Sequence, residues 1–201
     1  MQTMPINQRI RIRLLQAGGV LFAGLALFAA PAIGDGAHET IEMAGVALVL
    51  ACIAGRMWSI LYIGASKNSD LVMTGPYSMT RNPLYFFSTV GVAGIGLMLG
   101  SFVMAGALAL AAALALGYTA SREADYLRAS FGVAYDDYAR VTPMFWPNPS
   151  LYREPQQASF SPRALRRTFL DGLLFLLVFP LVELIEHAQA AGYLPVLLTL
   201  P

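Results

Sequence analysis

Cysteine and histidine are both scarce in this chain of 201 residues. Cys52 is the only cysteine, and His38 and His187 are the only histidines. A single thiol excludes an internal disulfide, and these three side chains cannot together supply a cysteine–histidine metal site. We expect Cys52 to be a small core or lipid-facing residue, both histidines to be solvated loop residues, and no metal to be bound.

Charge is equally sparse. Only 12% of the residues are charged, against roughly 25% in soluble domains, while 57% are hydrophobic and the mean hydropathy is +0.58. The composition therefore predicts a membrane protein, and the length predicts a single domain. A net charge of +1 argues against nucleic acid as a partner. Membrane lipids are the expected surroundings.

Five apolar runs indicate the membrane-spanning elements. They cover residues 16–33, 41–63, 84–99, 102–118 and 169–185. The longer runs suffice to cross about 30 Å of hydrocarbon as helices. We expect the first run to be retained as a span rather than removed as a signal peptide, and the tail from residue 193 to be too short to span. The prediction is an all-α, polytopic integral membrane protein with about five transmembrane helices.

Only Gly100 and Ser101 separate the third and fourth runs, which predicts a tight helical hairpin. Glycines in the hairpin allow the two backbones to approach closely. Within one domain, 1–201, we distinguish residues 1–63 with two spans, 64–147 with the hairpin, and 148–201 with a basic connector and the last span. Residues 34–39 are expected to form a polar turn, and Pro180 is expected to kink the last span.

Positive charge falls on one side of this topology. All 13 Lys and Arg residues lie at the N-terminus, at the near end of the second span, or in the two long connectors. The positive-inside rule places these connectors in the cytoplasm, with the N-terminus inside and the C-terminus outside. A bacterial-type inner membrane is the expected location.

The most distinctive stretch is residues 71–85, where glycine, proline, tyrosine and arginine gather between apolar runs. Gly75 and Pro76 mark a turn. Asn82 is expected to cap a following helix, and Pro83 suits its first position because proline lacks the N–H donor. The positive end of that helix would suit a carboxylate. A plain membrane-entry turn is the alternative interpretation.

A second polar stretch follows the hairpin at residues 122–138. It is expected to form an amphipathic cap on the cytoplasmic membrane surface, and the hairpin returns it to the side of residues 77–85. Glu123 could hold an ammonium or ribose group, and tyrosine faces could hold a sulfonium. Arg56, inside the second span, either snorkels to the interface or faces a cavity.

Two motifs with the apolar hairpin between them resemble the isoprenylcysteine carboxyl methyltransferase and phospholipid methyltransferase superfamily. The first is Gly-Pro-Tyr at 75–77 followed by Arg-Asn-Pro-Leu-Tyr at 81–85, and the second spaces Glu123, Leu127, Phe131, Tyr135 and Tyr138. The resemblance covers residues 56–147. Members are integral membrane enzymes that use S-adenosylmethionine.

The resemblance implies a set of site residues. Arg81 and Glu123 are the expected catalytic residues, and Arg56 and Arg122 are candidates for holding the substrate. The implied cofactor-binding residues are Leu71, Val72, Tyr77, Asn82, Pro83, Leu84, Tyr85 and Glu123. The family usually has histidine at position 82, often a second glutamate at 124, and in the prenylcysteine enzymes an arginine at 119; this chain has Asn82, Ala124 and Thr119.

The resulting hypothesis is an S-adenosylmethionine-dependent methyltransferase that acts at the cytoplasmic membrane face. Its acceptor would be lipidic or a small hydrophobic molecule, with carboxyl O-, phospholipid N- and thiol S-methylation all open. One alternative is a non-catalytic membrane scaffold or binding protein that keeps the fold. A transporter is less favoured, because no span is visibly broken at mid-membrane with charges facing inward.

Overall fold

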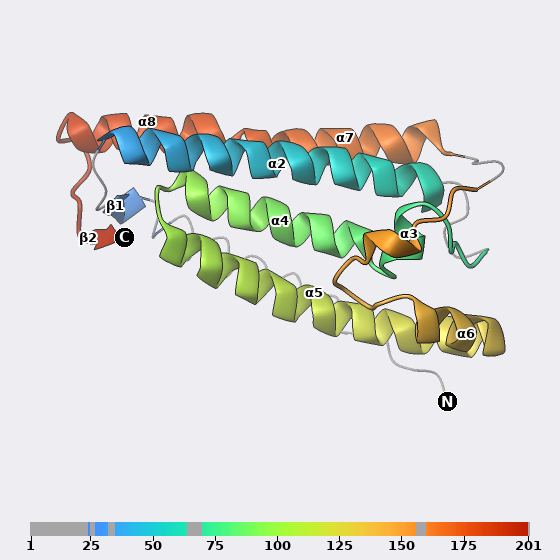
Figure 1. Ribbon diagram of the computed structural model, residues 1–201. Helices are drawn as coiled ribbons and strands as arrows, with labels where there is room; N and C mark the ends of the chain where they lie inside the picture. The colour runs from blue at the N-terminus through green and yellow to red at the C-terminus, as the bar shows by residue number, and fades with distance from the viewer. Residues whose placement is uncertain (1–23, 25–26, 32–34, 64–69, 156–159, 201) are drawn as a thin grey trace.

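The computed structural model describes residues 24, 27–31, 35–63, 70–155 and 160–200, and most of them are helical (Figure 1). The helices are α2 (Asp35–Ile63), α3 (Pro76–Met79), α4 (Pro83–Met98), α5 (Phe102–Phe131), α6 (Val133–Val141), the 3-10 turn η1 (Pro149–Leu151), α7 (Pro162–Leu176) and α8 (Val178–Ala190). Two short strands, β1 (Ala29–Pro31) and β2 (Leu198–Leu200), pair in parallel.

Three helical segments are long and apolar enough to cross a membrane. They are Gly36–Ile63, Phe102–Phe131 and Pro162–Ala190, and Pro83–Met98 is a shorter apolar helix. Apart from the short pairing of β1 and β2, the described chain is thus a helical integral membrane protein, as predicted. Most of the predicted first span, 16–33, lies outside the described residues. Its end at Ala29–Pro31 is extended rather than helical, because β1 pairs with β2 from the C-terminal tail.

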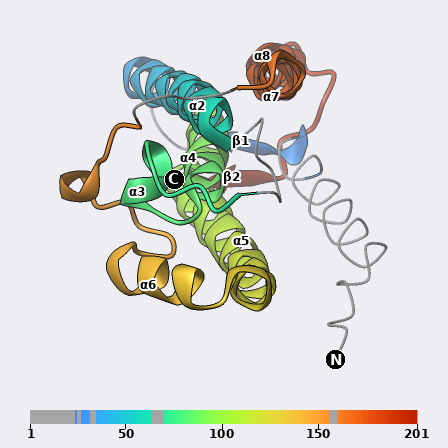
Figure 2. The same cartoon turned by 90° about the vertical axis from the view of Figure 1, so that its right-hand side faces the viewer.

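Helix α4 lies between α2 and α5, while α7 and α8 run along the other side of α2 (Figures 1 and 2). Val49, Ile53 and Met98 form the buried core between these helices, and Cys52 is fully buried beside them. The expectation that Cys52 is a small core residue is confirmed. The backbones of α2 and α4 meet closely, because a Cβ added to Gly45 would lie 2.6 Å from the Gly94 carbonyl oxygen.

The predicted helical hairpin is formed by α4 and α5, which a short turn connects. Gly100 adopts a φ of 65°, and the Ser101 hydroxyl accepts a hydrogen bond from the Met104 N–H at 3.1 Å, which caps α5. Helix α5 then runs unbroken to Phe131, a length of about 45 Å. The segment expected to form the cytoplasmic cap therefore comprises two helices: residues 122–131 are the last turns of α5, and α6 turns away at Gly132, whose φ is 55°.

The structure corrects two smaller predictions and bears out a third. Helix α2 begins at Asp35, so residues 35–39 are helical rather than a turn. His38 and His187 lie in α2 and α8 rather than in loops, and the His38 Nε2 is 3.2 Å from the Glu186 carboxylate, which joins the two helices. The expected kink of the last span is confirmed: the helix is interrupted at Leu177, since Pro180 has no N–H to donate to the carbonyl four residues earlier.

Candidate active site

The chain reverses sharply at Gly75, just before α3. Its φ of 60° favours glycine, and its N–H donates to the Arg153 carbonyl at 2.7 Å. A Cβ at Gly75 would overlap the Tyr62 ring from α2, so the turn lies directly on that helix. Gly75 therefore fixes where Tyr77 and α3 sit relative to the end of α2.

Residues 142–148, here called the strap, hold the start of α4 in place. The Arg81 N–H donates to the Pro143 carbonyl at 2.8 Å, the Asn148 N–H to the Met79 carbonyl at 2.9 Å, and the Asn82 Nδ2 to the Met144 carbonyl at 2.8 Å. Asn82 therefore precedes the helix as predicted, but its side chain does not cap it. The Met144 carbonyl of the strap accepts a hydrogen bond from the Asn82 side-chain amide, and this contact turns the amide toward the strap instead of toward the first N–H groups of α4. Pro83 occupies the first turn, as predicted.

A cavity of about 300 Å³ opens where the ends of α2, α4, α5 and α6 meet. All nine residues expected from the sequence to be catalytic or to bind a cofactor line this cavity: Leu71, Val72, Tyr77, Arg81, Asn82, Pro83, Leu84, Tyr85 and Glu123. Its volume is at the lower end of the range for small-molecule sites. The long α5 is what carries Glu123 back to the residues before α4.

Six further residues line the cavity that the sequence did not single out as site residues. They are Ile60, Ile63, Asp70, Leu127, Phe131 and Tyr138. The four-residue spacing of Glu123, Leu127 and Phe131 puts them on one helix face, and this pattern could have placed the latter two in the site. No feature of the local sequence marks Ile60 and Ile63 as site residues, because apolar residues are expected at the end of any membrane-spanning helix.

Two hydrogen bonds fix the tyrosines around the cavity. The Tyr85 hydroxyl donates to the Glu123 carboxylate at 3.0 Å, and the Tyr138 hydroxyl donates to the Tyr77 carbonyl at 2.6 Å. The first joins α4 to α5 across the cavity, and the second ties α6 to α3. The Glu123 side chain remains accessible to solvent, so its carboxylate can accept further hydrogen bonds.

The Tyr77 side chain is only 5% exposed, yet its hydroxyl has no hydrogen-bond partner within the described residues. Burial raises the pKa of Tyr77 far above its ordinary value of about 10, and Tyr138, Glu123 and Tyr85 raise it further. The hydroxyl therefore keeps its proton at neutral pH. Since unpaired buried hydroxyls are unusual, this group is suited to bind a ligand atom in the cavity.

Arg81 lies at the wall of the cavity. Its Nη1 donates to the Tyr135 hydroxyl at 3.1 Å, and its guanidinium carbon lies 5.9 Å from the centre of the Tyr135 ring. Its buried Nε has no hydrogen-bond partner among the described residues. No carboxylate forms an ion pair with Arg81 in that part of the chain, so its charge can act on an anionic ligand group.

Arg56 and Arg122, the two residues considered for the substrate, do not line the cavity. The Arg56 Nη1 donates to the Ser88 hydroxyl at 2.5 Å, between α2 and α4. Arg122 is exposed on α5. The two arginines are therefore in very different environments, one between apolar helices and one at the surface.

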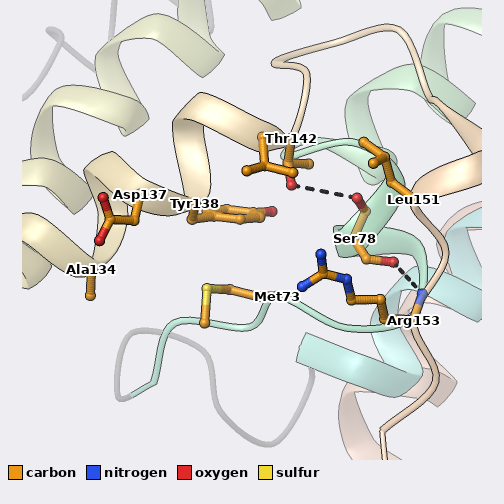
Figure 3. Close-up of a pocket in the computed structure, with 9 residues that line it drawn as sticks. Met73, Ser78, Ala134, Asp137, Tyr138, Thr142, Leu151 and Arg153 are labelled. Carbon is orange, nitrogen blue, oxygen red and sulfur yellow. Dashed lines mark hydrogen bonds between the residues drawn. The ribbon is translucent and has the colours of Figure 1, made fainter.

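A second cavity, of about 390 Å³, is also lined by Tyr138 (Figure 3). Ser78 organises its wall: its hydroxyl accepts a hydrogen bond from the Arg153 N–H at 2.9 Å, and its carbonyl accepts one from the Thr142 hydroxyl at 3.5 Å. Asp137 lines the same cavity but binds Arg140 at 2.9 Å. Tyr138 thus lines both cavities.

Residues 40–134 match the family described as phospholipid methyltransferase. The nickel-cobalt-cadmium resistance protein NccN of Alcaligenes xylosoxydans xylosoxydans is 40% identical over 163 residues, which cover 81% of this chain and 74% of that protein. The cobalt-zinc-cadmium resistance protein CzcN of Cupriavidus metallidurans is 37% identical over 161 residues, which cover 80% and 73%. No solved structure matches the chain significantly.

The fold and the cavity define an all-helical membrane protein with a tyrosine-lined pocket at the helix ends. The match to residues 40–134 spans all of α4 and α5 and includes every cavity-lining residue except Tyr138. The chain belongs to the phospholipid methyltransferase family, within the isoprenylcysteine carboxyl methyltransferase-like superfamily. The resemblance carried by the two motifs is thereby confirmed.

Proposed function

We propose that this protein is an S-adenosylmethionine-dependent methyltransferase that transfers a methyl group to a lipophilic acceptor at the membrane surface. The observation that carries the proposal is the 300 Å³ cavity, which gathers all nine expected site residues from separate parts of the chain. The Tyr77 hydroxyl, which has no partner among the described residues, gives the cavity a donor that a ligand could use. Because the chain belongs to a methyltransferase family, S-adenosylmethionine is the ligand that we expect in this cavity.

The residues fit the chemical groups of this cofactor. The N-terminal end of α4 carries partial positive charge and would face the carboxylate, with Arg81 beside it. Glu123 would accept from the ammonium or ribose hydroxyls, and the Tyr77 and Tyr85 rings would face the sulfonium. Leu71, Val72 and Leu84 supply the apolar walls that exclude water from the reacting atoms.

When bound, the cofactor supplies a methyl group whose bond to sulfur breaks as an acceptor lone pair forms the new bond, and the electron pair stays with sulfur. The protein mainly has to align the acceptor and keep the cavity dry. A carboxylate or thiolate acceptor needs no proton transfer. An amine acceptor must lose a proton, and Glu123 is the cavity carboxylate we assign to receive it. Tyr77 stays protonated and acts as a hydrogen-bond donor.

The charge distribution supports a cytoplasmic site. Apart from Arg56, which lies within the span formed by α2, the described Arg residues lie at the end of the molecule that carries α3 and α6, together with the cavity (Figure 1). His38 and Glu186 lie at the opposite end, near the two strands. By the positive-inside rule the cavity end faces the cytoplasm, and the inner membrane of a bacterium is the proposed location.

The names of the relatives support a proposal about the physiological role of this protein. Both are named as resistance proteins for divalent metals. Among the described residues, no group of three or more His, Cys, Asp or Glu side chains is arranged to hold a metal ion. We therefore propose that the protein serves metal resistance through a methylated membrane component, with lipids and the acceptor as its partners.

Calorimetric titration of the detergent-purified protein with S-adenosylhomocysteine tests the proposal. Saturable binding at a ratio of one per chain is expected, because the product of the cofactor retains the carboxylate, ammonium and ribose groups. A folded protein that shows no binding would favour the alternative of a non-catalytic scaffold that keeps the family fold. An added lipid acceptor would not be needed for this measurement.

Replacing Tyr77 with phenylalanine should change protein stability and S-adenosylhomocysteine binding in opposite directions. Removing an unpaired buried hydroxyl should raise the free energy of unfolding by about 1 kcal/mol, yet weaken S-adenosylhomocysteine binding by about tenfold. Thermal unfolding and calorimetry on the same sample measure both effects. Tyr138→Phe is the matched control for stability, because it removes a hydroxyl that is hydrogen-bonded to the Tyr77 carbonyl and should destabilise the protein. Undiminished S-adenosylhomocysteine binding by Tyr77→Phe would contradict the ligand-binding role of its hydroxyl.

A further inference from the structure

The second cavity is built entirely from residues outside the membrane-spanning segments. None of its lining residues belongs to Gly36–Ile63, Phe102–Phe131 or Pro162–Ala190, or to the shorter apolar helix Pro83–Met98. They come from α3, α6 and η1 and from the residues that flank these elements. The volume of about 390 Å³ lies within the range of small-molecule sites. A ligand of this cavity would therefore enter from water rather than from the bilayer.

Arg153 gives this cavity an available positive charge. Among the described residues no carboxylate pairs with its guanidinium, and the carboxylate that lines the cavity, Asp137, is bound to Arg140 at 2.9 Å. Figure 3 shows the Arg153 guanidinium reaching toward Tyr138 and Met73, with Asp137 at the opposite side. The cavity therefore suits an anionic group, since a guanidinium can form two parallel hydrogen bonds with a carboxylate or a phosphate.

The main chain of Arg153 is fixed before any ligand binds. Its carbonyl accepts from the Gly75 N–H at 2.7 Å, and its N–H donates to the Ser78 hydroxyl at 2.9 Å. The Ser78 hydroxyl in turn donates to the Gly75 carbonyl at 2.6 Å, which closes a small network around the turn. Because the backbone on both sides of the side chain is already ordered, anion binding at Arg153 costs less conformational entropy than it would in a free loop.

The rest of the lining is mostly apolar. It consists of Met73, Ala134, Val141, Leu151 and the ring of Tyr138. The hydroxyls of Ser78 and Thr142 already donate to backbone carbonyls, at 2.6 and 3.5 Å. A bare inorganic anion would leave these apolar side chains uncovered. The lining therefore fits an anionic group carried on a compact apolar or aromatic body.

Tyr138 connects this cavity to the candidate active site. It lines both cavities, and its hydroxyl donates to the Tyr77 carbonyl at 2.6 Å. Burial raises the pKa of Tyr138 above its ordinary value of about 10, so the hydroxyl keeps its proton and remains a donor at neutral pH. Ser78, which accepts from Arg153, directly follows Tyr77 in the chain. A ligand packed against Tyr138 would therefore hold Tyr77 in place in the first cavity.

We propose that the second cavity is an effector site for a small, water-soluble organic anion, and that its occupancy strengthens cofactor binding through Tyr138. The effector is a carboxylate or a phosphate monoester on a compact apolar body, with its anionic group at Arg153. The coupling rests on the proposed methyltransferase function, whereas binding of the anion does not. Thermodynamic linkage requires that the effector and the cofactor change each other's affinity by the same factor.

Calorimetric titration of the detergent-purified, full-length protein with phenyl phosphate and phenylacetate tests the site. Inorganic phosphate and 2-phenylethanol are the control ligands, since each lacks one of the two required parts. The wild type should bind at least one of the organic anions saturably, and more tightly than either control by about tenfold or more. Preference for phenyl phosphate would identify a phosphate monoester, and preference for phenylacetate a carboxylate. Equal affinity for all four compounds, or no binding of either organic anion, would overturn the proposal.

Replacing Arg153 with glutamine should weaken binding of the preferred anion by about tenfold or more, while Arg153→Lys should retain part of it, because lysine keeps the charge but loses the planar fork. Arg163→Gln is the matched control, since it removes one positive charge from an exposed side chain at the start of α7, outside the cavity lining. It should bind the anion like the wild type. Undiminished binding by Arg153→Gln would show that the anion binds elsewhere.

Ala134→Leu tests the cavity without changing its charge. Ala134 is exposed on α6 and lines the cavity, so the larger side chain should fill space there while the helix is kept. Anion binding should fall by about tenfold or more, with S-adenosylhomocysteine affinity in the absence of the anion unchanged. Full anion binding by Ala134→Leu would mean attraction to a basic surface rather than a cavity site. This variant also decides the matter if Arg153→Gln fails to fold.

The coupling is measured by titrating S-adenosylhomocysteine with and without a saturating amount of the preferred anion. The anion should raise the affinity of the wild type by about fivefold or more, and should have no effect on Arg153→Gln. Tyr138→Phe keeps the ring and should bind the anion, yet lose the coupling, because it lacks the hydroxyl that holds the Tyr77 carbonyl. An unchanged affinity in the wild type would overturn the effector role. Absence of S-adenosylhomocysteine binding would instead refute the proposed function, and the anion titration would still decide whether the site exists.

Discussion

Replacing Glu123 with glutamine is expected to weaken S-adenosylhomocysteine binding by more than about tenfold, because a carboxylate acceptor for charged or hydroxyl donors is lost. Glutamine keeps the size of the side chain and can still accept from the Tyr85 hydroxyl, which now lies 3.0 Å from the carboxylate. The loss should therefore reflect charge rather than collapse of the cavity. Calorimetric titration of wild type and variant measures the change.

Asp125→Asn is the matched control for Glu123→Gln. Asp125 lies on the same helix, is 56% exposed at its side chain and lies 3.9 Å from Arg128, outside the cavity lining. This substitution removes the same charge from the same surface, so long-range electrostatic effects should be similar. Equal affinities for both variants would contradict the role of Glu123 as a direct ligand of the cofactor.

Replacing Gly45 with alanine is expected to lower the melting temperature by about 5 °C or more. The added Cβ would lie 2.6 Å from the Gly94 carbonyl oxygen and 2.7 Å from the Met98 nitrogen. Both atoms belong to the α4 backbone, which cannot rotate away as a side chain could. Overpacking of this kind costs about 1–3 kcal/mol, and α4 would have to shift away from α2. Thermal unfolding of the detergent-purified protein measures the effect.

Gly106→Ala provides the control for Gly45→Ala. It is a glycine within α5 with no atom within 4 Å of its added Cβ. Alanine in an open helical position should stabilise the protein by up to about 1 kcal/mol, since it favours the helix more than glycine does. The two substitutions should thus shift the melting temperature in opposite directions. A decrease of the same size in both would show that the α2–α4 contact is not the cause.

The membrane class, four of the helices and the meeting of the two polar stretches could be predicted from the chain itself. Apolar runs of sufficient length fold as helices in a bilayer, because their backbone groups have no other partners there. A two-residue link at Gly100 and Ser101 leaves only an antiparallel hairpin, so Glu123 had to return toward Tyr85. The motif residues around the cavity follow from that geometry.

Individual side-chain roles could not be predicted in the same way. Asn82 favours a helix cap by its type, but Met144 supplies a competing carbonyl from 62 residues away. The two histidines looked like loop residues, yet His38 meets Glu186 across 148 residues. The local sequence indicates which neighbouring groups a side chain can bind, but it does not indicate partners that are distant in the chain.

The sequence by itself determined that this chain crosses a membrane, forms a hairpin at Gly100 and carries the family motifs, since these depend on composition, run length and local spacing. Only the tertiary structure decided that the Tyr77 hydroxyl is buried without a partner among the described residues and that Arg56 is held against Ser88 between α2 and α4. Both depend on how α2, α3, α4 and α6 pack together, because burial and hydrogen bonding of a side chain are set by elements distant in the chain.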